Sequence, residues 1–482
     1  MTSKYSRLTG SMALLVTVGV LIVGRGVSAR ANDWPQFRGP TGLGYTDEKN
    51  LPITWGGAND ENVLWKAPLV GQGHASPIVC QERVFVCTAR WPETVRRREE
   101  VIPEHHVLCY AAGDGKLLWD RQVPSGPWLR TDFRSGPGGG YACPTPTTDG
   151  RLVYCAFGSS VLAALDLQGT IVWRKEIVPY TFDVTLGSSP ILYQDTLILL
   201  CAMAKPSDSS VIALDKRTGD VRWRQPLPET AFGHSTPVLL PIRGKAQLVF
   251  AASGGSPSPR ALQGLDPATG QPIWWCWGAG DTASPAYGGG LVYFDSGRGG
   301  PGVAVDPTGG GDVSNTHVKW RIDQVPEGIG SPTIVGDYVY RLHSPGVLKC
   351  WKLGDGSQVY AQRLDGISTT WASLIVDGNG RIYFANAGKS YVIQSGPQFK
   401  VLAVNDLGDG NHASAAVADG GMFLVGVKEV FCIRGRYSPR GTSSTSPASM
   451  YWPPSVWWQW MAIVLRPFFS AASASFEMDM GT

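Results

Sequence analysis

A short pattern that recurs along most of this chain constrains its fold more than any other feature. Most copies open with Ser-Pro or Thr-Pro, and after a longer first interval they lie 41 to 48 residues apart. Repeats of this length, with several short hydrophobic segments in each, are typical of a β-propeller. Eight anchor positions carry the opening hydroxyl residue: Ser76, Thr145, Ser189, Thr236, Ser284, Ser331, Ser373 and Ser414. The pattern therefore predicts eight blades.

The second half of the pattern predicts how a blade is built and how blades pack together. Its clearest copy runs from Ala213 to Trp223 and reads Ala-x-Asp-x-x-Thr-Gly-x-x-x-Trp. Glycine accepts a positive φ in a tight turn, and tryptophan buries a large flat surface. Hydrophobic segments around this copy predict four antiparallel strands in a blade. The tryptophans expected to dock one blade on the next are Trp65, Trp119, Trp173, Trp223, Trp274 and Trp320.

The last repeat predicts how the ring is closed. Residues 414–433 hold only three strands' worth of sequence, and residues 62–69 offer the missing outer strand. A strand from the far end of the chain would leave no free sheet edge at the seam. The expected fold is all-β: an eight-bladed β-propeller of four-stranded antiparallel blades, closed by an N-terminal strand.

Composition shifts divide the chain into regions. The expected regions are a signal peptide at 1–31, an N-terminal extension at 32–59, the propeller at 60–434 and a low-complexity or disordered tail at 435–482. We expect the polar extension to pack on the outside of the propeller. A charged insertion is expected in the first blade from Thr88 to His106, with His105 and His106 exposed.

The N-terminus predicts export. Lys4 and Arg7 precede a mostly apolar stretch from residue 11 to residue 24, which is short for a membrane span. Ala29-Arg30-Ala31 offers a cleavage site, and an uncleaved membrane anchor is the alternative. We expect a periplasmic or secreted monomer without a stable membrane span after cleavage. The net charge of +3, with no basic block, argues against a nucleic-acid partner.

Nine cysteines in an exported protein raise the question of disulfides. Cys109, Cys350 and Cys432 stand where other repeats have a small alanine, so we expect them in the core. Cys80 and Cys87 lie on successive predicted strands of one hairpin, where a pairing is open. The sequence contains no Cys-x-x-Cys, which excludes c-type haem attachment, thioredoxin-like redox chemistry and the common zinc knuckles.

The two halves of the repeat together resemble the pyrroloquinoline quinone (PQQ)-like propeller family over about residues 60–434. The lead from Asp33 to Pro40, Asp-Trp-Pro-Gln-Phe-Arg-Gly-Pro, is similar to the opening of exported members. The family includes non-enzymatic outer-membrane assembly propellers and quinoprotein dehydrogenases. The resemblance implies that an enzymatic member would use a disulfide between adjacent cysteines, a calcium held by Glu and Asn, and a catalytic Asp. This chain has no pair of adjacent cysteines.

The chain has the propeller repeat but not the adjacent cysteines that the resemblance implies for an enzymatic member. We therefore expect a non-catalytic protein with no metal and no cofactor. We expect an exported module that binds or scaffolds an envelope protein or a small ligand. The alternative is a PQQ- and calcium-dependent dehydrogenase that oxidises alcohols or sugars, and a third reading is a hydrolase or lyase at the channel mouth. The sequence contains no GxSxG, no HExxH and no complete P-loop.

Histidines gather at one repeat position, two residues before the anchor. His74, His234 and His412 occupy it, and Cys143 and Trp371 are among their equivalents. Equivalent positions of a closed ring map onto one circle, so we expect these side chains around one mouth of the central channel. A structural role at a polar strand start and a ligand or metal site both remain open. Acidic residues of the preceding loops that would assist a site are Asp183, Glu229, Asp281 and Glu327.

Overall fold

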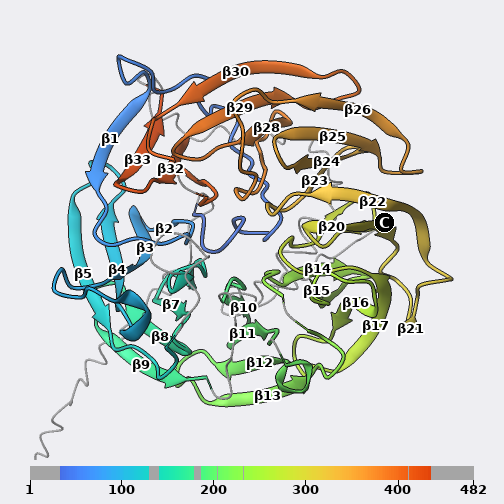
Figure 1. The fold of residues 1–482 in the computed structure, drawn as a ribbon, viewed down its shortest axis with the longest axis horizontal. Helices are drawn as coiled ribbons and strands as arrows, with labels where there is room; N and C mark the ends of the chain where they lie inside the picture. The colour runs from blue at the N-terminus through green and yellow to red at the C-terminus, as the bar shows by residue number, and fades with distance from the viewer. Residues whose placement is uncertain are drawn as a thin grey trace, which may run out of the picture.

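Eight β-sheets stand around a central axis in the computed structural model, which describes residues 33–129, 140–177, 186–203, 205–231, 233–410 and 412–435. Figure 1 shows that the sheets follow one another around the ring in chain order. The eight-bladed all-β propeller is thus confirmed. The expected signal peptide, and all but the first residue of the expected tail, lie outside the described residues. Within the described ranges, no helix is long and apolar enough to cross a membrane.

The first four blades each begin with the innermost strand. The first blade contains β2 (Ile78–Cys80), β3 (Arg83–Arg90), β4 (Glu104–Ala111) and β5 (Leu117–Val123). The second contains β6 (Thr147–Thr148), β7 (Leu152–Phe157), β8 (Val161–Asp166) and β9 (Ile171–Glu176). The third contains β10 (Ile191–Tyr193), β11 (Thr196–Cys201), β12 (Ser210–Asp215) and β13 (Val221–Pro226). The fourth contains β14 (Val238–Ile242), β15 (Lys245–Ala251), β16 (Ser258–Leu265) and β17 (Pro272–Gly278).

The next three blades follow the same order. The fifth contains β18 (Ala286–Gly288), β19 (Leu291–Phe294), β20 (Arg298–Val305) and β22 (Val318–Glu327). The sixth contains β23 (Thr333–Val335), β24 (Tyr338–His343), β25 (Val347–Lys352) and β26 (Gln358–Arg363). The seventh contains β27 (Ile375–Val376), β28 (Arg381–Phe384), β29 (Lys389–Gln394) and β30 (Lys400–Asp406). A short β21 (Gly311–Asp312), from a long turn of the fifth blade, pairs in parallel with β17. Two 3-10 turns, η1 (Arg98–Glu100) and η3 (Pro206–Asp208), lie in loops.

The eighth blade is completed from the far end of the chain. It contains β31 (Ala416–Ala418), β32 (Gly421–Val425), β33 (Glu429–Arg434) and, as its outermost strand, β1 (Val63–Pro68). The β1 strand runs antiparallel to β33 and places Trp65 opposite Cys432. Closure of the ring by an N-terminal strand, expected from the incomplete last repeat, is therefore confirmed.

A closed circle of hydrogen bonds joins the innermost strands of all eight blades. At every anchor position the backbone N–H donates to the hydroxyl of the anchor residue in the next blade, with N···O distances of 2.9 to 3.1 Å. The bond from Ser414 to Ser76, at 2.9 Å, crosses the seam. The anchor residues are buried, and an unpaired buried N–H costs about 1–3 kcal/mol. This circle explains why each repeat opens with serine or threonine.

Tryptophans of several outer strands connect their blade to the next one through a hydrogen bond and a ring contact. The indole N–H of Trp173 donates to the carbonyl of Lys216 in the next blade at 2.9 Å. Its ring lies over Gly219, where an added Cβ would come within 2.8 Å of the ring. Both contacts recur at Trp65, Trp119 and Trp320, and Trp223 makes the ring contact with Gly270.

Substitution of Gly219 by alanine is expected to weaken this docking. Gly219 has a φ of +74°, so a side chain there costs about 1–2 kcal/mol, and the new Cβ would also press on the Trp173 ring. Gly244 is the matched control, because its φ is +75° and an added Cβ would meet nothing within 4 Å. We expect Gly219→Ala to lower the free energy of unfolding by about 1–3 kcal/mol more than Gly244→Ala in urea denaturation. Equal losses would show that the ring contact contributes nothing.

Trp274 differs from the other tryptophans expected to dock. Its indole N–H donates to Oε1 of Gln247 in its own blade at 2.7 Å. Trp274 faces Gly264 across the strand pair, and a Cβ at that position would lie 2.4 Å from Nε1. Glycine therefore lets the ring fold back over its own sheet. The ring is still buried in a cluster that includes Val303 and Val305 of the fifth blade.

The N-terminal extension packs on the outside of the propeller only in its second half, where Gly56 pairs with Asp406 of the outermost strand β30, so that expectation is wrong for the first half. Trp34 pairs with Val79 of β2 through two backbone hydrogen bonds of 2.9 Å. Buried Arg38 donates to the carbonyls of Pro285 at 3.2 Å and Pro332 at 2.7 Å, in the fifth and sixth blades. These carbonyls belong to the Ser-Pro pairs of innermost strands, so the guanidinium holds the segment inside the ring. Figure 1 shows the segment, in dark blue, at the centre of the ring.

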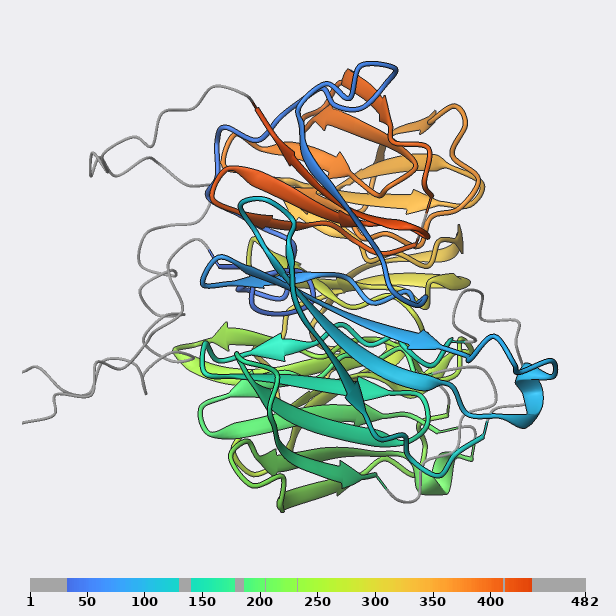
Figure 2. The ribbon, with the colours of Figure 1, turned by 90° about the vertical axis from the view of Figure 1, so that its left-hand side faces the viewer.

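The two ends of the ring differ. Seen from the side in Figure 2, the dark-blue segment and the insertion that carries η1 lie at opposite ends. Gln72, just before β2, pairs with Ala89 near the end of β3, so the innermost strand of the first blade begins on the side of the insertion. The ring has two ends, and we call the one at which the innermost strands begin, on the side of the insertion, the ring end.

The insertion is shorter than expected, and its histidines are buried. Pairing between β3 and β4 extends further than expected, so the loop between them covers residues 91–103. His105 is fully buried, with Nε2 2.6 Å from Oγ of Ser159. His106 is also buried, and its Nδ1 lies 2.6 Å from a carboxylate oxygen of Asp120. The expectation that both histidines are exposed is wrong because they belong to a strand.

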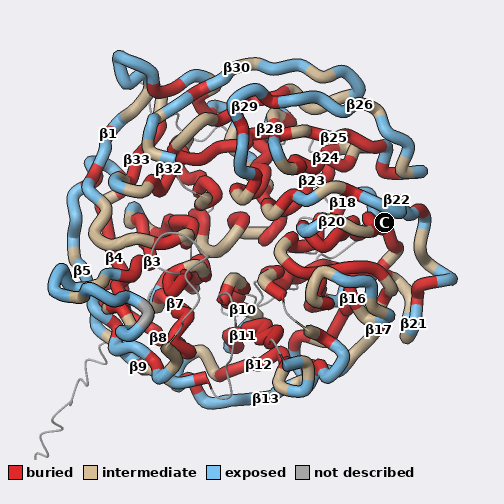
Figure 3. The backbone as a smooth tube through the Cα atoms, viewed as in Figure 1, coloured by how far each residue is buried: buried red, intermediate tan, exposed pale blue. Residues whose placement is uncertain are grey.

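The inner strands of the blades consist mostly of buried residues, whereas the outer strands carry most of the exposed ones (Figure 3). The structure contains no disulfide between any of the nine cysteines, all of which it describes, so Cys80 and Cys87 are not joined in it. Cys109, Cys350 and Cys432 are fully buried, and each faces the aromatic residue of the neighbouring outer strand. A small side chain at this position leaves room for the large ring opposite.

Candidate functional site

The eight residues that stand two before the anchors form a circle at the ring end. Backbone hydrogen bonds between neighbouring blades hold the residues of this circle in place. The N–H of His74 donates to the carbonyl of Ala142 in the next blade at 2.9 Å, and the N–H of His234 donates to that of Asp281 at 2.8 Å. All eight residues are half-buried: His74, Cys143, Gly187, His234, Thr282, Ile329, Trp371 and His412.

Three rings from three consecutive blades meet in this circle. Trp371 of the seventh blade stacks on His412 of the eighth, with ring centroids 4.3 Å apart and planes 27° apart. His74 of the first blade lies 5.1 Å from the His412 ring and 5.6 Å from the Trp371 ring. Chain closure brings His74 beside His412, although 338 residues separate the two positions just as they separate their anchors. The structure therefore assembles an aromatic cluster across the seam.

The cluster is uncharged at neutral pH on its His412 side. Burial, and then the neighbouring His74, lower the pKa of His412 to about 4. The Nδ1 atoms of both histidines are buried, while both residues remain partly exposed. The cluster thus offers neutral imidazole and indole surface, which suits flat, apolar or hydrogen-bonding groups of a ligand.

The other expected residues of the circle lie apart from this cluster. His234 packs against Gly187, where an added Cβ would come within 2.6 Å of the histidine Cβ, and both of its ring nitrogens are buried. Cys143 is half-buried on the segment that leads into the second blade. The structure therefore joins His74, Trp371 and His412 but not His234.

The expected acidic residues do not gather in one place. The buried carboxylate of Asp281 forms an ion pair with Arg298, with the nitrogen and oxygen 2.9 Å apart. Glu229 is exposed and lies 3.6 Å from Arg260. Glu327 is an exposed residue at the end of β22. Asp183 lies outside the described residues.

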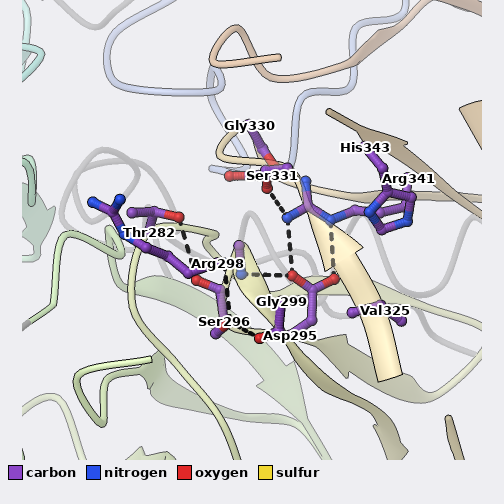
Figure 4. Close-up of polar contacts among 12 residues, drawn as sticks. Thr282, Asp295, Ser296, Arg298, Gly299, Val325, Gly330, Ser331, Arg341 and His343 are labelled. Atoms are coloured by element: carbon purple, nitrogen blue, oxygen red, sulfur yellow. Dashed lines mark hydrogen bonds and ion pairs between the residues drawn. The ribbon is translucent and has the colours of Figure 1, made fainter. Parts of the chain in front are cut away.

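A buried ion pair near the ring end was not expected from the sequence. Arg341 of β24 makes two hydrogen bonds to Asp295, both 2.9 Å long, and both side chains are almost fully buried (Figure 4). Arg341 also donates to the carbonyls of Gly328 and Gly330, which flank the circle position of the sixth blade. The N–H of Gly297 donates to Asp295 at 2.8 Å. The pair therefore links the fifth and sixth blades.

Electrostatics keep this network ionised at Asp295 and neutral at His343. Burial would raise the pKa of Asp295, but the Arg341 guanidinium outweighs it and holds the pKa below its usual value. Burial, and then Arg341, lower the pKa of His343 to about 4. Nδ1 of His343 lies 2.9 Å from the carbonyl of Pro326, so Nδ1 carries the proton of the neutral ring. A charge within an otherwise apolar strand, Tyr-Val-Tyr-Arg-Leu-His, was the one sequence signal for this network.

The carboxylates at the ring end do not fit a calcium–PQQ pair. Calcium takes six to eight oxygen ligands in proteins. In the part of the chain that the structure describes, the buried carboxylates at this end, Asp281 and Asp295, are already bound to arginines. Among the described residues, no group of three or more His, Cys, Asp or Glu side chains is arranged to hold a metal.

Comparison with known proteins agrees with this architecture. A family model described as outer membrane protein assembly factor BamB matches residues 208–396, so the resemblance of these repeats to the PQQ-like propellers is confirmed. A comparison with curated protein sequences gave no match.

One solved structure shows the likeness in fold, and a second one is less similar. The crystal structure of quinohemoprotein alcohol dehydrogenase from Comamonas testosteroni is 14% identical with a TM-score of 0.61, over 88% of this chain and 84% of that chain. BamB from Moraxella catarrhalis is 14% identical with a TM-score of 0.48, over 74% of this chain and 99% of that chain. At this identity the first likeness shows the fold and not the activity.

Proposed function

We propose that this protein is an exported, non-catalytic propeller that binds an envelope protein or a small ligand at the ring end. The observation that carries the proposal is the cluster of His74, Trp371 and His412. Three partly exposed rings from successive blades are held on a closed platform. Aromatic side chains in such positions are frequent centres of binding energy. The name of the matching family model, an outer membrane assembly factor, favours a protein of the cell envelope as the partner.

The proposal includes the organisation of the chain. Residues 1–31 act as a signal peptide, residues 60–434 form the propeller, and residues 435–482 form a tail that binding does not require. The mature protein then resides in the periplasm or outside the cell as a monomer.

The test compares variants of the full chain in a capture experiment. Trp371→Ala removes the largest ring of the cluster, and Trp277→Ala is the matched control because Trp277 is a half-buried tryptophan on the outer strand β17. Cross-linking in an envelope fraction and mass spectrometry should identify a partner or co-purified molecule. We expect wild type and Trp277→Ala to hold it equally and Trp371→Ala to hold it at least about tenfold less. Equal capture by all three would overturn the site.

A separate assay addresses catalysis. Incubation of the purified protein with PQQ and calcium should give no dye-linked oxidation of alcohols or sugars. Turnover that depends on both additions would overturn the non-catalytic function and establish the dehydrogenase. Hydrolysis or elimination in a substrate panel, lost in His234→Ala, would establish the third alternative.

A further inference from the structure

Two buried cysteines face each other between the first and second blades. Successive side chains of a strand point to opposite faces. On β3, Val86 packs in the cluster toward the eighth blade, and Cys87 packs in the cluster toward the second blade. On β7, Tyr154 packs toward the third blade, and Cys155 belongs to the same cluster as Cys87. The alternation of both strands therefore directs the two thiols into one interface.

The two thiols are in contact within this interface. The hydrogen bond of Cys87 with the thiol of Cys155, and then burial, raise the pKa of Cys87 well above its usual value. Sγ of Cys155 also donates to the carbonyl of Ala163 at 3.6 Å, on the neighbouring strand of its own blade. Cys87 is 1% exposed and Cys155 is 0% exposed. Facing sheets lie about 10 Å apart, a spacing that a disulfide between sheets bridges in immunoglobulin domains.

We propose that Cys87 and Cys155 form a disulfide between the first and second blades when the protein folds in an oxidising compartment. Each thiol loses its proton and the sulfurs form one S–S bond. The two electrons pass by thiol–disulfide exchange to the disulfide of an exported thiol oxidase, which becomes a dithiol. Disulfides form and persist in exported proteins, so the occurrence of the bond in the cell rests on the export proposed above.

The position of the bond connects it to the candidate binding site. The cluster that holds Cys87 and Cys155 also contains Ala75 and Ala142, which are the neighbours of His74 and Cys143 in the chain. The disulfide would thus fix the first blade to the second directly behind two positions of the ring-end circle. Buried thiols exchange slowly, so the bond forms before the two blades have packed together.

The test counts thiols in the full chain. The protein is refolded in a glutathione redox buffer, then denatured and alkylated with and without prior reduction, and its mass and tryptic peptides are measured. Without reduction we expect two fewer alkylated cysteines than the nine of the sequence, and a peptide that joins Cys87 to Cys155. Cys87→Ser and Cys155→Ser should lose the joined peptide. Cys350→Ser, which removes another buried thiol, should keep it.

Two further experiments test the proposal when refolding fails and separate the disulfide from export. For any preparation that does not refold, native wild type is instead incubated with diamide long enough for the interface between the two blades to open transiently, and the same joined peptide is expected. Nine alkylated cysteines after both treatments, or a peptide that joins another pair such as Cys80 and Cys87, would overturn the proposal. Protein recovered from the periplasm of a host tests export by itself. Its absence there would contradict export, while the pair formed in vitro would still stand.

Discussion

Removal of residues 33–68 is expected to abolish folding of the propeller. The deletion exposes the edge of β33, removes Trp65 from its contact with the first blade and removes Arg38 from the ring centre. Loss of one buried tryptophan costs about 3–5 kcal/mol, and the whole free energy of unfolding of a domain is about 5–15 kcal/mol. We expect an insoluble protein, or one without a cooperative thermal transition in circular dichroism.

Removal of residues 436–482 is the control for this truncation. These residues follow the last strand, and we expect the shortened chain to melt within a few degrees of wild type. A cooperative transition in the first truncation, at the temperature of the full chain, would show that β1 is not needed to close the ring. Loss of folding in the second would show that the propeller extends beyond β33.

Arg341→Met is expected to be the most damaging single substitution outside the ring seam. It leaves the carboxylate of Asp295 buried without its partner, a change that costs about 3–5 kcal/mol. The double variant Asp295→Asn/Arg341→Met should recover most of this loss, because it no longer buries an unpaired charge. Arg97→Met is the control, since Arg97 and its partner Glu100 are both exposed and such pairs are worth about 0–1 kcal/mol. Urea denaturation of the four proteins measures the differences.

The same pair predicts a dependence of stability on pH. The pKa of Asp295 is lower in the folded protein than its usual value. The pair therefore contributes stability that is present above the unfolded pKa of about 4 and is lost as the pH falls through the folded pKa. Stability measured downward from pH 6 should fall more steeply in wild type than in the double variant. Parallel curves would mean that Asp295 contributes nothing to acid unfolding.

The repeat predicted the architecture because each blade depends on contacts that recur. Spacing of the anchors predicted eight blades, and the incomplete last repeat predicted closure by β1. The same register put His74 and His412 on adjacent blades, where their rings lie 5.1 Å apart. These features follow from position within a repeat, and position can be read from a single sequence.

Contacts made only once were not predicted. Arg38 reaches two proline carbonyls that lie 247 and 294 residues away, and Asp295 meets Arg341 across two blades. Neither contact has an equivalent in other repeats, so periodicity gives no signal for it. The burial of His105 was missed for a related reason. The length of β3 and β4 is set by their mutual pairing, while a charged loop between them suggested an earlier break.

The circle of anchor hydrogen bonds also explains which positions of the repeat can differ in residue type from one blade to another. A tryptophan docks one blade on one neighbour, so the seventh unit can do without it and Trp274 can turn back on its own sheet. The anchor hydroxyls instead form a single loop in which every bond points the same way around the axis. Loss of one hydroxyl would break the circle of hydrogen bonds that all eight blades share, and an added ninth blade would have to form the same bonds on both sides. The anchor hydroxyl is therefore present in every repeat, while the larger residues around it differ from one repeat to another.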